Sequence, residues 1–383
     1  MNKPPGGEGA ENVGLEECLP LLAPLFRAGI PVWLVGGAVR DLREGRVPRD
    51  LDFVAEAEVD DLRPHLPKAV PVGGKNSTLV LSLGKGRAPL EISGAGRGIH
   101  ADLERRDFSV NAMAWRVGPA GLEGEIVDPF GGREDLGKGL LRVPLASRDP
   151  FREDPVRILR LLRFVSTRGY GVEGGTLSMA REALDKLPCM AGERRLREIA
   201  LFWEGTHLAR VREALPEGFC GRALGAGIFG KRLLPLSAEK GREAYVRAVG
   251  AEASRGLVRM WIFAWEAAGP EGGIETRWGR SLWRGGDGSD LPLSRRERQF
   301  LVSLDRLKSI LEGWSAAGPL DPRRLVPLWR DPSREARGAV LRWMAGRLPP
   351  EIQDSFWEWV RQAERLGQRL SADGFRSLPR HRR

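Results

Sequence analysis

The chain has 383 residues, more than one typical domain, so we expect two or three domains. Its formal net charge of +10 favours a polyanionic partner, although an arginine-rich proteome would leave the same excess, since only nine of the 61 basic residues are lysine. No stretch approaches the roughly 20 apolar residues of a membrane span, which excludes the membrane-spanning class.

Residues 1–12 are rich in Gly, Pro and Glu, and we expect them to be disordered. Residues 15–28 have the apolar spacing of a helix. Five short apolar or alternating runs then predict strands at 31–35, 51–56, 78–83, 89–93 and 123–129. Helical segments are expected at 39–43 and 108–114. This pattern predicts a mixed α/β module that ends near residue 142.

From Asp154 onward the strand pattern largely disappears and helical periodicity dominates. Most of the 12 tryptophans lie in this half at helical spacing, which is typical of core packing. We therefore predict an α+β chain, with a mixed-sheet head at 13–143, a helical neck at 144–205 and an all-α body and tail at 206–383. The pattern leaves open whether 206–383 is one domain or two, and it leaves the oligomeric state open.

The three cysteines, Cys18, Cys189 and Cys220, are scattered and have no metal-ligand spacing. Such cysteines predict buried free thiols in a reducing compartment. The first residues, MNKPPGGEGAEN, lack the apolar core of a signal peptide. We expect a soluble, cytoplasmic protein.

The first chemical motif follows the apolar run at 31–35. Gly36 and Gly37 let the backbone approach a ligand closely, and a strand–glycine–helix turn presents backbone N–H groups to a phosphate. Arg40, one turn into the helix, can add a guanidinium to the same phosphate. A tight strand–helix turn without a ligand would carry the same two glycines.

Asp50 and Asp52 follow at the start of the next predicted strand. Residues i and i+2 of a strand share a face, and two carboxylates held together repel unless a cation lies between them. Oxygen ligands of this kind suit Mg²⁺, and two such ions can activate a hydroxyl and steady a leaving pyrophosphate. An Asp-x-Asp surface turn is the alternative, but the combination with the glycine turn favours nucleotidyl transfer.

Five motifs, in order, resemble those of the tRNA nucleotidyltransferase and bacterial poly(A) polymerase family, within the DNA polymerase beta superfamily. They are GG-x-VRD with RDLDF, RRDFSVNAMA at 105–114, DPFGG at 128–132, EDPVRILRLLRF at 153–164 and, more loosely, ERRLRE at 193–198. The match covers about residues 31–205. The resemblance implies a polymerase-beta-like head, an RNA 3′-end substrate and a two-metal Mg²⁺ mechanism with Asp50 and Asp52 as the catalytic and metal-binding residues.

The second motif adds candidate nucleotide-binding residues. Arg105 and Arg106 can hold a triphosphate or the tRNA end, and Asp107 and Asn111 would share a helix face. By the resemblance, the latter pair would bind the ribose 2′-hydroxyl. An Asp–Arg pair with an Asn cap is the structural alternative. DPFGG is interpreted as a structural turn and a hinge between head and neck.

In the fourth motif, Asp154, Arg157, Arg160 and Arg163 recur every third residue along an otherwise apolar helix, and buried charges are costly unless they are paired or liganded. The resemblance implies that Asp154 and Arg157 read the Watson–Crick edge of the incoming base, as a partner base would. Arg160 and Arg163 would meet phosphate or lock that pair. An inter-helix salt-bridge network is the alternative.

Members of this family add CCA, CC, the final A alone, or poly(A). CCA-adding relatives carry a longer flexible segment before the RRD motif, whereas here only residues 92–104 separate Glu91 from it. The short segment resembles CC-adding enzymes, so we expect CTP, and ATP if CCA is completed, as substrates at the 3′ end of tRNA. A CC-adding enzyme would need a separate A-adding partner. The basic body would contact the acceptor and T arms of tRNA by shape.

Two readings from other classes remain. An inactive relative serving as an RNA-binding module would not need the two carboxylates. A small-molecule nucleotidyltransferase of the aminoglycoside type shares the head motif but would not need the charged helix at 153–164 or the large helical body.

Overall fold

The computed structural model describes residues 14–48, 50–72, 78–82, 89–144, 149–216 and 218–229, with a few further positions between 341 and 365. The expected disorder at 1–12 and nearly all predictions beyond residue 229 lie outside the described residues. The chain divides into two compact units, one containing residues up to Arg157 with Tyr170–Glu182, the other Ile158–Gly169 with residues from Ala183 onward. The predicted domain limits remain a prediction.

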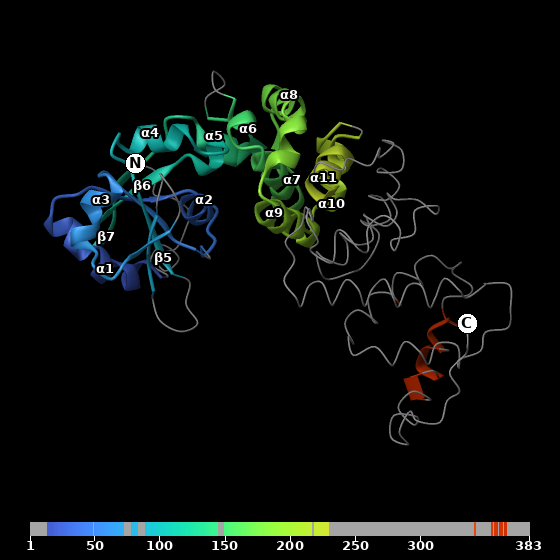
Figure 1. The fold of residues 1–383 in the computed structure, drawn as a ribbon, viewed down its shortest axis with the longest axis horizontal. Coiled ribbons are helices and arrows are strands. Elements are labelled where there is room, and N and C mark those ends of the chain that lie inside the picture. Colours follow the sequence, from blue (N-terminus) through green and yellow to red (C-terminus); the bar gives the residue numbers. More distant parts are fainter. Residues whose placement is uncertain are drawn as a thin grey trace. The chain divides into compact units, whose positions relative to one another are not determined.

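The first unit is built on a seven-stranded mixed sheet (Figure 1). Its order is β3-β4-β5-β2-β1-β6-β7, and every pairing is antiparallel except that of β2 with β5. The strands are β1 Val32–Val35, β2 Asp52–Ala55, β3 Val70–Val72, β4 Thr78–Leu81, β5 Leu90–Gly94, β6 Ala114–Gly118 and β7 Gly121–Val127. This confirms the predicted mixed sheet.

Side chains alternate between the two faces of the sheet, so each face builds its own core. Val32 and Leu34 of β1 join a cluster that includes helix α1, Leu15–Arg27, whereas Val35 joins a second cluster with α4, Ile99–Glu104. The other head helices are α2 Gly37–Arg43, α3 Val59–Leu62, the 3₁₀ turns η1 Arg63–His65 and η2 Ser109–Asn111, and α5 Gly132–Lys138.

The prediction of a helix at 108–114 is wrong. Residues Ser109–Asn111 form only the turn η2, and Ala114 already begins β6, which pairs with β1. Two local bonds explain the turn, because the carboxylate of Asp107 accepts from the backbone N–H of Phe108 at 2.8 Å and from the side chain of Asn111 at 2.9 Å. Such side-chain bonds compete with helical backbone bonds.

After α5 come β8 Leu140–Leu141, α6 Pro150–Glu153, α7 Val156–Arg168, β9 Gly171–Val172 and α8 Gly174–Glu182. β8 and β9 form a two-stranded parallel sheet, so the neck predicted as all-helical contains a strand. The second unit contains α7 from Ile158 onward. It also contains η3 Leu184–Cys189, α9 Gly192–Glu204, α10 Leu208–Ala214 and α11 Phe219–Phe229. The helices following the sheet agree with the predicted α+β class.

The cysteines are only partly as predicted. Cys18 is buried in the head core, and burial raises the pKa of its thiol to about 11. Cys189 is exposed, so the prediction of burial is wrong there, because η3 leaves its side chain at the surface. Cys220 is half-buried. Within the described ranges, no helix has both the length and the apolar character needed to cross a bilayer.

Candidate active site

The glycine turn predicted from the sequence joins β1 to α2. Gly36 lies at φ 69° and ψ −131°, a positive-φ conformation that residues with a side chain rarely adopt, and α2 begins at Gly37. A methyl group at Gly36 would lie 2.7 Å from Nη1 of Arg106 and 4.0 Å from Oδ2 of Asp52. The fold therefore brings the turn, an arginine and a carboxylate to one place.

Arg40 is buried, with 6% of its surface exposed. Its Nε and Nη2 donate to Asp41 at 3.0 and 2.9 Å, and its Nη1 donates to Oδ1 of Asn111 at 2.5 Å. The guanidinium thus connects α2 to η2, and the expected contact with phosphate remains a prediction.

Asp107 and Asn111 form the pair that their spacing predicted, although on a turn and not on a helix. Both are buried, and Asn111 donates to Asp107 while accepting from Arg40. The three side chains make one polar network beside the glycine turn. Their binding of a ribose hydroxyl stays a prediction.

Both carboxylates of the Asp-x-Asp motif are exposed. Asp52 is the first residue of β2, but Asp50 lies in a bend before it, so the strand argument holds for Asp52 alone. The sheet register pairs Asp52 with Val35 at the end of β1 and with Glu91 on β5. The motif therefore lies at the same edge as the glycine turn.

These two carboxylates fit Mg²⁺ by their chemistry, since that ion binds through one or two carboxylates together with substrate phosphates. Among the residues that the structure describes, no group of three or more His, Cys, Asp or Glu side chains could hold a metal. Phosphate oxygens would have to complete the coordination.

Arg105 and Arg106 follow α4 and share one carboxylate. Arg106 donates from Nε and Nη2 to Oδ2 of Asp102 at 3.0 and 2.8 Å, and Nη2 of Arg105 lies 3.7 Å from Oδ1. Arg105 is exposed, whereas Arg106 is half-buried beside Gly36. Only Arg106 is placed next to the turn.

Asp154 lies just before α7, whose second residue is Arg157. The guanidinium of Arg157 donates to the backbone carbonyls of Arg105 at 2.6 Å and Arg106 at 3.3 Å. It therefore ties the start of α7 to the RRD motif. Reading of a base edge by Asp154 and Arg157 remains a prediction.

Arg160 and Arg163, further along α7, lie in the second unit. Both reach Glu198 on α9, Arg163 through Nε at 2.6 Å and Arg160 through Nη1 at 3.4 Å. Arg163 also stacks on Phe164, 4.4 Å from the ring centre. Here the geometry is that of the inter-helix salt bridge considered as the alternative; a phosphate contact stays a prediction.

Three contacts were not foreseen from the sequence. They involve Asp102, Glu198 and Glu56, whose Oε1 accepts from the backbone N–H of Ile99 at 3.2 Å and from Nε1 of Trp33 at 3.1 Å. The spacing of Asp102 and Arg106, four apart on a helical segment, was a usable signal. Glu56 lies 43 residues from Ile99, and no local pattern links them.

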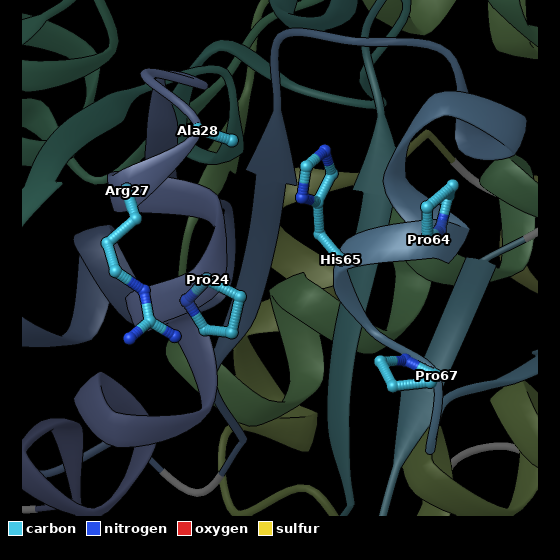
Figure 2. Close-up of a pocket in the computed structure, with 6 residues that line it drawn as sticks. All are labelled: Pro24, Arg27, Ala28, Pro64, His65 and Pro67. Atoms are coloured by element: carbon cyan, nitrogen blue, oxygen red, sulfur yellow. The ribbon is translucent and has the colours of Figure 1, made fainter.

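A separate cavity of about 560 Å³ opens between the end of α1 and η1 (Figure 2). It is lined by Pro24, Arg27, Ala28, Pro64, His65 and Pro67. None of the predicted site residues lines it.

The model of the poly A polymerase head domain matches residues 32–94 and 91–142. A CC-adding tRNA nucleotidyltransferase of Halalkalibacterium halodurans is 36% identical over 194 residues, 50% of this chain and 50% of the relative. A CCA-adding enzyme of Geobacillus stearothermophilus is 31% identical over 274 residues, 67% of this chain and 61% of the relative. The alignments thus span about half to three fifths of these relatives.

Among solved structures, the Thermotoga maritima CCA-adding enzyme complexed with tRNA superposes with a TM-score of 0.65 at 26% identity, covering 93% of this chain and 84% of that chain. Structures of a CCA-adding enzyme with CTP and with ATP, each 25% identical, superpose with TM-scores of 0.62 and 0.63 over 92% of this chain and 81% and 82% of those chains.

Proposed function

Because the chain belongs to the class II family of CCA-adding and CC-adding tRNA nucleotidyltransferases, with a poly(A) polymerase head domain, we propose that it extends the 3′ end of tRNA. It transfers CMP from CTP without a template and releases pyrophosphate. The observation that carries the proposal is the convergence of the Gly36 turn, Asp52 and Arg106 at one edge of the sheet.

In the proposed reaction the 3′-oxygen of the tRNA attacks the α-phosphorus of the nucleotide. A bond forms between them, the bond from that phosphorus to the bridging β-phosphate oxygen breaks, and the hydroxyl proton passes to solvent water. Mg²⁺ held by Asp50 and Asp52 would favour the deprotonated hydroxyl and offset the charge of the leaving pyrophosphate. The N–H groups of the Gly36–Gly37 turn and the cations of Arg105 and Arg106 bind the triphosphate.

The nucleoside would be recognised by the two remaining groups of residues. Asn111, fixed between Arg40 and Asp107, would contact the ribose 2′-hydroxyl. Asp154 and Arg157 would read the base edge. The fixed orientation of Asn111 supports the first role, since a network satisfied on both sides holds one geometry.

We further propose that the product ends in CC. The segment before the RRD motif has no room for a long flexible loop, since β5 ends at Gly94, α4 begins at Ile99 and only residues 95–98 remain between them. The CC-adding relative at 36% identity supports the same assignment. Full CCA addition, supported by the CCA-adding relatives, is the second candidate, ahead of addition of A alone or poly(A). A CC-adding enzyme would need a separate A-adding enzyme.

An inactive RNA-binding relative is the alternative from another class. It would not need an exposed Asp52 beside a glycine turn whose positive φ strains any residue with a side chain. The body from residue 206, proposed to contact the acceptor and T arms, lies largely outside the described residues.

The test uses tRNA transcripts that end at the discriminator base or in CC, incubated with Mg²⁺ and labelled CTP or ATP. We expect growth by two C residues and no addition of A to the transcript ending in CC. Growth to CCA would assign full CCA addition. No growth on either transcript would overturn the proposed enzymatic activity.

Asp50→Ala and Asp52→Ala are each expected to lower transfer by at least 10³-fold while the protein still binds tRNA, because the metal ligands act on the chemical step. Asp61→Ala, an exposed aspartate on α3, is the matched control and should keep full activity. Activity retained in either motif variant would remove these carboxylates from the metal site.

A further inference from the structure

We propose that Asp102 is a positioning residue, which holds Arg106 against the glycine turn so that its free edge meets the triphosphate. The inference rests on the proposed function and adds a residue to it. Asp102 lies in α4, three residues before the RRD motif begins, and it touches neither the turn nor the two motif carboxylates in any described contact.

Two of the three guanidinium nitrogens of Arg106 are bound to Asp102. Nε and Nη2 both donate to Oδ2, at 3.0 and 2.8 Å. The third nitrogen, Nη1, lies 2.7 Å from where a methyl group on Gly36 would stand, and it makes no hydrogen bond within the described residues. The nitrogen that Asp102 leaves unbonded therefore lies beside the turn that is proposed to bind phosphate.

The helix that carries Asp102 is itself fixed. Glu56, just after β2, accepts from the N–H of Ile99 at the start of α4 and from the indole of Trp33 on β1. Ile99 and Leu103 are buried in the core between α4 and the sheet. Asp102 is therefore attached to the rigid sheet and not to a loop.

Such an attachment matters because a free arginine side chain loses much rotamer freedom when it binds a ligand. An arginine already held in its binding geometry loses less, so the affinity rises without a new contact. Asp102 is also half-buried and close to both Arg105 and Arg106, so its negative charge is compensated and does not repel the triphosphate.

The test is a double-mutant cycle on the full chain, with KM for CTP, kcat and the Kd of CTP as readouts. Asp102→Asn should raise KM and Kd about tenfold and change kcat less than threefold. In an Arg106→Ala background the same change should have no further effect, since contacts that act through one another are not additive. His100→Gln, exposed on the same helix, is the control that should match the parent.

Unchanged KM and Kd in Asp102→Asn would overturn the inference. So would an equal loss in the Arg106→Ala background, because it would mean that Asp102 acts only on the fold. Should Asp102→Asn melt below the assay temperature, Asp102→Ala takes its place in the cycle with the same criteria. If the parent chain transfers no nucleotide, the proposed function fails and the inference fails with it; the parent assay distinguishes the two.

Discussion

At the scale of single residues, Gly36 combines two constraints that usually occur apart. Its φ of 69° strains any residue with a Cβ, and the space where a Cβ would lie is taken by Arg106. Gly29 has nearly the same φ, 71°, but open space around it. Alanine substitutions at these two glycines can therefore distinguish the effect of backbone strain from the effect of displacing Arg106.

We expect Gly36→Ala and Gly29→Ala each to destabilise the fold by about 1–3 kcal/mol, because both put an alanine at positive φ, and Gly36→Ala to cost the more because its methyl group also meets Nη1 of Arg106. Only Gly36→Ala should lower nucleotide transfer, by at least tenfold, because the methyl group displaces Nη1 of Arg106. Chemical denaturation and the tRNA extension assay measure the two effects. Equal activity in both variants would contradict the proposed role of the turn.

At the scale of elements, the DPFGG motif acts as a cap, which agrees with its interpretation as a structural turn. The carboxylate of Asp128 accepts from the N–H groups of Gly132 at 2.6 Å and Arg133 at 2.9 Å, the first residues of α5. A side chain at Gly132 would clash with the backbone of Ser109, so the glycine allows close packing there. The buried carboxylate of Asp135 accepts a hydrogen bond from the Ser109 hydroxyl. Helix α5 is thus fastened to η2, the turn that carries Asn111.

Removal of this cap should loosen that contact. Asp128→Ala is expected to cost about 1 kcal/mol of stability, the usual value of a lost N-cap, and to lower the melting temperature by several degrees. Glu134→Ala, an exposed acidic residue in the first turn of the same helix, should leave the melting temperature unchanged. Equal melting of all three proteins in a calorimeter would exclude the cap as a stabilising element.

At the scale of the whole molecule, the net charge of +10 is the property that best suits a tRNA substrate. A protein that neutralises phosphates with arginine and lysine releases bound counterions, so its affinity falls as salt rises. We expect the Kd for a tRNA transcript to increase at least tenfold between 50 and 200 mM KCl, measured by filter binding. A Kd independent of salt would contradict phosphate contacts as the main source of affinity.

Much of the head could be predicted from the sequence alone. Alternating apolar runs mark strands because a strand exposes successive residues to opposite faces, as Val32, Leu34 and Val35 do here. Gly36 and the acidic pair were proposed as site residues because the chemistry expected of them depends on residue type and short spacing. The pairing of Asp107 with Asn111 followed in the same way from their separation of four residues.

Tertiary structure alone decided the rest. The apolar residues at 108–114 suggested a helix, but pairing with β1 made Ala114 part of β6, and hydrogen bonds to Asp107 made the preceding residues a turn. The salt bridges of Glu198 and the bond from Glu56 to Ile99 join segments more than 30 residues apart. No local pattern encodes such contacts, because they exist only once the sheet and helices have packed.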